Sequence, residues 1–484
     1  MSASEWVYRG VTEQSDGFVT GELDPVELTE AYLARIRAVD GQLRSFITVL
    51  EDEAREAAGR SAERLRAGER RSRLDGIPFA VKDQMLIEGV RVTGGSRVLA
   101  DFVGSRDATV VRRLREAGAV LLGTLNTHEF HSGMTRDPLF GKVRNPWNLE
   151  RSPGASSSGS AAAVAAGLCS FSLGGDTGGS IRAPASYCGV VGLKATWSRV
   201  SRDGVIPLAY SMDCVGPLAR RVEDTALVLE HLAGADPADP TCSRLPVPRY
   251  SEALSGELSG LRVGVIAEML DPSVVQPAAI ATTEAAVAVL RELGATVTTV
   301  SVPLLHQTRF ISVALVMAEA ASHHRKWLLE RYEDYDVNTR TNFLTGALLP
   351  AGALGQAQRM RALVARQVVS SLEEVDVLVG PTADAAFPLQ PRDPLPLREE
   401  VRASLKMPAM ASGPQTRVFS LSGHPSLSVP CGFDPDGLPL GLQLATRHFD
   451  EATLLRVAHA YEARTPWHTR RPAFTASTWG PGGP

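Results

Sequence analysis

Short apolar segments alternate with helical segments along most of the chain. Apolar runs of strand length occupy residues 77–81, 119–124, 169–173, 261–266, 296–300, 375–379, 427–430 and 438–444. Helical periodicity or helix-forming composition occupies residues 25–40, 51–67, 109–117, 160–166, 282–293 and much of 312–372. Strands that alternate with helices in this way are typical of an α/β protein with a parallel or mixed sheet.

The same pattern indicates how the chain is organised. Asp24, Pro25 and Glu27 form a helix start, with a capping acid, proline in the first turn and a glutamate at the third position. We therefore expect residues 1–70 to be a helical segment that packs on a core domain spanning 71–474. The Gly/Pro-rich residues 475–484 are predicted to be a disordered tail.

One stretch departs from this alternation. Residues 152–180 contain eight serines and seven glycines among 29 residues, a composition that is usual in flexible linkers. However, a helix-forming run at 160–166 and a strand-like run at 169–173 separate two Gly/Ser clusters, at 154–160 and 174–180. Glycines at the ends of ordered elements permit tight turns and bring backbone N–H groups close to a ligand. The pattern favours a catalytic loop over a linker.

Composition narrows the classes of function. The 484-residue chain is 44% hydrophobic and carries a net charge of −4, which gives no basic footprint for nucleic acid or an anionic membrane. No apolar run reaches the ~18–20 residues that span a bilayer, and the first residues lack a signal-peptide core. The five scattered cysteines suggest neither a disulfide framework nor a zinc site. We expect a cytoplasmic protein whose partner is a small molecule, without nucleic acid or membrane.

Candidate chemistry comes from serine and lysine. Lys82 ends a buried strand, where an ammonium is costly unless it reaches solvent or pairs with Asp83. None of the ten histidines lies within 152–180 and no G-x-S-x-G motif occurs, so a Ser-His-Asp triad is not favoured. A desolvated lysine can instead serve as the base for a serine. His128 and His131 have metal-ligand spacing, but no third ligand accompanies them.

The motifs at these positions resemble those of the amidase signature family. They are GIPFAVKD around Lys82, RSPGASSSGSAAAVAAG around Ser156 and GGDTGGSIRAPASYCGVVGLKAT around Ser180, within a signature block at about 74–230. The resemblance implies a large twisted mixed β-sheet flanked by helices on both faces. It also implies a triad of Lys82, Ser156 preceded by a cis peptide, and Ser180 as the nucleophile. The implied chemistry uses no cofactor and no metal.

The resemblance implies further site residues. The backbone N–H groups of Thr177, Gly178, Gly179 and Ser180 would form an oxyanion hole. Ser157, Asp176 and Arg182 would support the site, with Asp176 and Arg182 bracing the loop as an ion pair. This chain has Gly154-Ala155 where the family has two glycines before the bridging serine, and Ser158 where it has another glycine.

The family contains both stand-alone amidases and the glutaminase component of glutamyl-tRNA(Gln) amidotransferase, its A subunit. Arg361 falls where that subunit has a glutamine-binding arginine, but Gly413 falls where it has an aspartate. Its Asn-Leu-Ala-Gly run is Ser420-Leu421-Ser422-Gly423 here. These departures favour a stand-alone hydrolase of a linear carboxamide, for which a homodimer is one expected assembly. The amidotransferase component remains the alternative, and a non-catalytic nucleotide-binding protein is disfavoured because both Gly-rich phosphate-binding motifs are absent.

Overall fold

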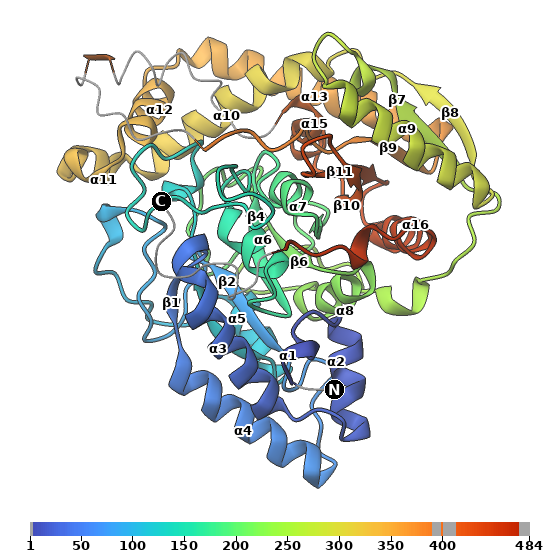
Figure 1. Ribbon diagram of the computed structural model, residues 1–484. Helices are drawn as coiled ribbons and strands as arrows, with labels where there is room; N and C mark the ends of the chain where they lie inside the picture. The colour runs from blue at the N-terminus through green and yellow to red at the C-terminus, as the bar shows by residue number, and fades with distance from the viewer. Residues whose placement is uncertain (1–2, 390–397, 400–412, 474–484) are drawn as a thin grey trace.

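The computed structural model describes residues 3–389, 398–399 and 413–473, so the predicted tail at 475–484 lies outside the described residues. An 11-stranded mixed sheet runs through the molecule in the order β1-β3-β2-β4-β6-β5-β10-β11-β9-β7-β8, flanked by helices (Figure 1). The prediction of an α/β fold built on a large mixed sheet is therefore confirmed.

The strands are short, and most of their residues are buried. They are β1 (Phe46–Val49), β2 (Pro78–Lys82), β3 (Val120–Leu125), β4 (Phe171–Asp176), β5 (Val191–Lys194), β6 (Cys214–Ala219), β7 (Arg262–Ile266), β8 (Thr296–Val300), β9 (Val377–Pro381), β10 (Ser426–Phe433) and β11 (Pro439–Ala445). Neighbours β10 and β11 pair antiparallel, whereas β2 pairs in parallel with both β3 and β4.

The helices connect the strands and cover the sheet. They are α1 (Ala3–Trp6), α2 (Val11–Thr20), α3 (Pro25–Leu43), α4 (Glu51–Ala67), α5 (Thr109–Glu116), α6 (Ser158–Ala165), α7 (Arg182–Cys188), α8 (Val222–Leu232), α9 (Pro277–Glu292), α10 (Thr308–His323), α11 (Arg325–Glu330), α12 (Val337–Ala347), α13 (Ala351–Glu374), α15 (Pro414–Ser422) and α16 (Glu451–Arg464). Among the described residues, none of these helices has the length and apolar character that crossing a membrane requires.

The N-terminal segment contributes a strand to the sheet as well as helices. As predicted, Asp24 caps α3 by accepting a hydrogen bond from the backbone N–H of Val26, and Pro25 occupies the first turn. Between α3 and α4, however, the segment contributes β1, which pairs antiparallel with β3 at one edge of the sheet. Trp6 and Leu28 are buried in the same hydrophobic core as the sheet. The first 70 residues are thus built into the main core.

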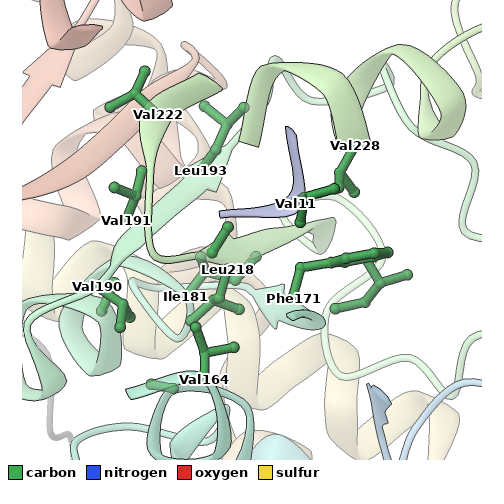
Figure 2. Packing of buried hydrophobic residues seen from close by; sticks show 14 of the residues in the cluster. Val11, Val164, Phe171, Ile181, Val190, Val191, Leu193, Leu218, Val222 and Val228 are labelled. Carbon is green, nitrogen blue, oxygen red and sulfur yellow. The ribbon is translucent and has the colours of Figure 1, made fainter. Parts of the chain in front are cut away.

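The Gly/Ser-rich stretch is buried in the core where it crosses the sheet. Figure 2 shows Val164 of α6, Phe171 of β4 and Leu218 of β6 packed together, with Val228 of α8 nearby. Phe171 also stacks on Phe79 of β2, with ring centroids 5.4 Å apart. Such burial of aliphatic and aromatic side chains stabilises a fold by about 25 cal/mol per Å² of apolar surface. The stretch that resembled a linker is therefore one of the most deeply buried parts of the molecule.

We predict that Phe171→Ala lowers the free energy of unfolding by about 3–5 kcal/mol, because it empties a fully buried site and removes the stack on Phe79. The matched control is Phe310→Ala, at a phenylalanine that is 74% exposed, for which the change is within about 0.5 kcal/mol. Urea unfolding followed by circular dichroism measures both. Equal effects of the two substitutions would contradict this description of the core.

Candidate active site

The parallel pairing of β2 and β4 brings lysine and serine chemistry to one edge of the sheet. Phe79, Ala80 and Val81 of β2 lie opposite Phe171, Ser172 and Leu173 of β4. Both strands run in the same direction, and the register places Lys82, at the end of β2, level with Gly174, two residues before β4 ends. The segment that follows β4 reaches Ser180, two residues before α7 begins at Arg182. The sheet register thus gathers the predicted residues from positions about 100 apart in the sequence.

Lys82 and Ser156 are in direct contact. The Lys82 Nζ donates a hydrogen bond of 2.8 Å to the Ser156 Oγ, and both residues are buried. Burial lowers the pKa of Lys82 to about 7, although the carboxylates of Asp213 and Asp176 act to raise it. A lysine with this pKa has a substantial population of neutral amine at neutral pH. Lys82 can therefore accept a proton through Ser156.

Asp83 is not the partner of this lysine. Its Oδ2 accepts hydrogen bonds from the backbone N–H and the hydroxyl of Thr93, and burial raises its pKa to about 7. Consecutive residues at the end of a strand project to opposite faces, which separates the two side chains. The interpretation of Lys82 as half of a simple ion pair with Asp83 is therefore wrong.

The two Gly/Ser clusters meet through their backbones. The Ser157 N–H donates to the Ser180 carbonyl at 3.3 Å, and the Ser157 hydroxyl bridges the N–H and carbonyl of Gly175 at 3.1 Å each. Ser157 therefore connects the segment of Ser156 to the end of β4. Gly154 (φ +115°) comes so close to α7 that a Cβ there would lie 2.8 Å from the Pro184 Cα. Ser180 is half-buried, as a nucleophile that must meet a substrate requires.

Two details of the predicted relay differ in the structure. The described chain contains no cis peptide bond, so the peptide that precedes Ser156 is trans, the form that costs less for a non-proline residue. In addition, no hydrogen bond between the hydroxyls of Ser156 and Ser180 is found among the described residues. Catalytic hydrogen bonds are often long in a site without substrate and tighten when the substrate is bound.

The loop at residues 177–180, called the oxyanion loop below, offers fewer backbone N–H donors to a substrate than the sequence predicted. The N–H of Gly179 (φ +125°) donates to the Asp176 Oδ1 at 2.7 Å, which withdraws that group from a substrate oxygen. In the described part of the chain, the N–H groups of Thr177, Gly178 and Ser180 have no hydrogen-bond acceptor. These three remain as candidate oxyanion donors, and the inclusion of Gly179 among the donors is corrected.

Asp176 and Arg182 form the predicted ion pair at the base of this loop. Both side chains are fully buried, and the Arg182 Nη2 and Nε lie 2.9 and 3.0 Å from the two carboxylate oxygens. Burial alone would raise the pKa of Asp176, but the Arg182 guanidinium lowers it to about 2. Arg182 also donates to the Thr416 carbonyl and the Ser420 hydroxyl of α15. The pair therefore fixes the nucleophile loop to a helix more than 230 residues away.

The two histidines of the H-x-x-H pattern each form a hydrogen bond with a different partner. The His128 Nδ1 is 2.5 Å from the Gly133 carbonyl, and the His131 Nδ1 is 3.1 Å from the Thr127 hydroxyl. Burial lowers the pKa of His128 to about 4 and that of His131 well below its usual value. Across the described ranges, no group of three or more His, Cys, Asp or Glu side chains could hold a metal ion.

A small cavity of about 60 Å³ is lined in part by Thr177 of the oxyanion loop and by the end of β4. Its lining includes Asp176, Thr177, Asp213, Gln84 and His131. Sequence analysis missed Asp213, whose Oδ1 accepts a 2.5 Å hydrogen bond from the Thr177 hydroxyl. The available signal was an acid directly before an apolar run in SMDCVGPLAR, the same anomaly that drew attention to Lys82.

Helix α15 and the residue before it include positions at which this chain departs from the amidotransferase subunit, namely Gly413 and the run from Ser420 to Ser422. The Thr416 hydroxyl donates to the Gly178 carbonyl at 2.9 Å, so the first turn of α15 lies against the oxyanion loop, and Gly413 is the residue that precedes this turn. Arg361 lies on α13 and is half-buried. Its guanidinium donates to the Leu421 carbonyl and to the hydroxyl and carbonyl of Ser211. This arginine connects three segments around the site.

Comparison with known proteins agrees with this geometry. The profile of the Amidase family matches residues 27–455. The A subunit of glutamyl-tRNA(Gln) amidotransferase from Roseiflexus sp. (strain RS-1) is 42% identical over 96% of this chain and 97% of its own length. The corresponding protein of Chloroflexus aggregans (strain MD-66 / DSM 9485) is 41% identical over 97% of this chain and 99% of its own length.

Solved structures of both functional kinds share the fold. The native peptide amidase from Stenotrophomonas maltophilia has a TM-score of 0.83 and 31% identity, over 97% of this chain and 99% of its own. The A subunit of glutamyl-tRNA(Gln) amidotransferase from Thermotoga maritima has a TM-score of 0.79 and 31% identity, over 95% of this chain and 96% of its own. With a family match over nearly the whole chain, this protein belongs to the amidase signature family, whose enzymes act on amide C–N bonds.

Proposed function

We propose that the chain hydrolyses a primary amide through an acyl-enzyme on Ser180, with Ser156 and neutral Lys82 as the proton relay. The observation that carries this proposal is the 2.8 Å hydrogen bond between the buried Lys82 amine and the Ser156 hydroxyl. A serine hydroxyl is a weak nucleophile unless a base removes its proton and nearby donors stabilise the developing oxyanion. The relay supplies the first requirement and the loop at 177–180 the second.

The steps balance without a cofactor. The Ser180 Oγ attacks the amide carbonyl while its proton passes to Ser156 and the proton of Ser156 passes to Lys82. The tetrahedral oxyanion forms beside the N–H groups of Thr177, Gly178 and Ser180. Collapse breaks the C–N bond, Ser156 gives its proton to the leaving nitrogen, and Lys82 returns one to Ser156. Water then attacks the ester with the same relay, which releases the carboxylate and regenerates Ser180.

Two observations bear on which amide is cleaved. The curated relatives at 41–42% identity over almost the whole chain are amidotransferase A subunits, which favours a glutamine-hydrolysing component of a larger assembly. The contrary observation is local, because Gly413 provides no carboxylate for an ammonium at the start of α15. We therefore propose the amidotransferase function first. A stand-alone hydrolase of a linear carboxamide is the second candidate.

We predict that Ser180→Ala abolishes amide hydrolysis, and that Lys82→Ala and Ser156→Ala each lower kcat/KM by roughly 10²–10⁴-fold, the usual contribution of general acid–base catalysis. Ammonia release and mass detection of an acyl adduct on Ser180 measure these effects. Ser158→Ala is the matched control, because the Ser158 hydroxyl is buried with no hydrogen bond in the described part of the chain. Near-normal turnover in Lys82→Ala would contradict the relay.

The pH dependence follows from the state of Lys82. Below its pKa of about 7 the lysine is protonated and cannot accept a proton, and above it the neutral amine is available. We therefore predict that kcat/KM rises with pH through a midpoint near 7 and then levels off. A rate profile from pH 5 to 9 on the purified chain measures this, and a rate that is still rising steeply at pH 9 would exclude Lys82 as a neutral base.

A substrate panel separates the two candidates. For the amidotransferase function, we predict that free L-glutamine releases ammonia at least tenfold faster than propionamide, benzamide or a peptide C-terminal amide at equal concentration. The preference should be strongest in the presence of the other amidotransferase subunits. The opposite order, with the isolated chain active on simple amides and inert to glutamine, would establish the stand-alone hydrolase and confirm the significance of Gly413.

A further inference from the structure

Asp213 is a buried acid whose position ties it to the catalytic loop. It directly precedes β6, which pairs antiparallel with β4 in a register that sets Cys214 opposite Asp176. One step further along each strand, Asp213 therefore lies beside Thr177. Its Oδ1 accepts the Thr177 hydroxyl at 2.5 Å.

The second oxygen of this carboxylate fixes another segment. The Asp213 Oδ2 accepts backbone N–H groups from Leu208 at 2.8 Å and from Ala209 at 3.0 Å. Burial raises the pKa of Asp213, but its three hydrogen bonds and the guanidinium of Arg202 favour the charged form. The carboxylate thus joins the oxyanion loop to the loop that leads into β6. If Thr177 were mobile, the backbone N–H groups of this loop would not be held at the positions that a developing oxyanion requires.

Asp213 also acts on the base. Two carboxylates raise the pKa of Lys82, and the effect of Asp213 is the larger. The other, Asp176, is neutralised by its two-point contact with Arg182. The remaining titratable groups near Lys82 are His128 and His131, which burial keeps neutral, and the neighbouring Asp83. Arg202, the cation that faces Asp213, also lies 3.7 Å from Asp239.

We propose that Asp213 is a positioning residue that holds residues 177–180 in place through its hydrogen bond to Thr177. The inference rests on the proposed function. Oxyanion donors act only if they are held in the geometry of the transition state, and the hydrogen bond from Thr177 to Asp213 supplies such a restraint. The Asp213 carboxylate also favours the protonated form of Lys82, which supports a role for this residue in the site.

The two effects can be separated by variants. Asp213→Asn removes the charge and weakens the hold on Thr177, so the acid limb should move by roughly half to one pH unit to lower pH and the plateau should fall. Thr177→Val removes the hydrogen bond but keeps the charge, so the plateau should fall roughly tenfold with the acid limb unmoved. Thr177→Ser keeps the hydroxyl and should stay near the wild-type rate. Asp75→Asn, at another buried acid paired with Arg64, is the control that should leave the pH profile unchanged.

The readout needs no knowledge of the substrate. A fluorophosphonate phosphonylates an activated serine, forming an Oγ–P bond with loss of fluoride while the proton passes to the base. Its rate of attachment to Ser180 in the full chain, measured from pH 5 to 9, reports both the base and the oxyanion loop. Circular dichroism and gel filtration check that each variant is folded.

The outcomes distinguish this inference from the function on which it rests. A wild-type chain that is not labelled at Ser180 overturns the proposed function and this inference with it. A labelled wild type whose Asp213→Asn variant keeps the wild-type labelling rate at the plateau overturns the inference alone. If Asp213→Asn does not fold, Thr177→Val decides, because an unchanged labelling rate in that variant contradicts the role of the Asp213–Thr177 contact.

Discussion

The proposed site depends on the burial of one amine, that of the Lys82 side chain. Lys82 is fully enclosed at the end of β2, and its amine donates to the Ser156 hydroxyl. Burial of a charged group is costly, and the cost is reduced if the group gives up its proton. The sheet therefore converts an ordinarily cationic side chain into a base at neutral pH.

The charged side chains near Lys82 are held in place by contacts of their own. Asp176 is committed to Arg182, which in turn reaches the carbonyl and hydroxyl oxygens of α15. The loop that ends at Ser180 is thereby held by the Asp176–Arg182 ion pair and by helix α15. Thr416 of that helix bonds the Gly178 carbonyl, which orients the adjoining N–H groups. The proposed catalytic serine, oxyanion donors and base are thus supported by groups that are themselves fixed by hydrogen bonds and an ion pair.

Sequence reasoning singled out Lys82 because a lysine at the end of a buried strand is unusual, and it assigned Ser156 and Ser180 through the resemblance of their motifs to the amidase signature family. It missed residues whose place is set by strand pairing. Strand β6 was not predicted, because Gly216 and Pro217 weaken the strand signal, yet it lies between β4 and β5. Strand β5 has only four residues and depends on its partners. Asp213 becomes visible only through the pairing of β6 with β4, a contact between distant segments.

Two details of the site follow from the conformation of the backbone. The resemblance implied a cis peptide before Ser156 and a donor at Gly179, but the described chain has a trans peptide and directs that N–H to Asp176. These depend on backbone torsions, which residue types do not determine. The resemblance matched Arg361 to a glutamine-binding arginine, and its contacts show that it bridges α13, α15 and the loop containing Ser211.

The most direct test of the account is the protonation state of Lys82 itself. The chain contains only five lysines, at positions 82, 142, 194, 326 and 406, so the side-chain signals of protein labelled with ¹³Cε-lysine can be assigned by comparison with a Lys82→Met variant. An NMR titration from pH 5 to 10 should show the Lys82 signal moving to that of a neutral amine with a midpoint near 7. A signal that remains that of an ammonium up to pH 10 would contradict the account.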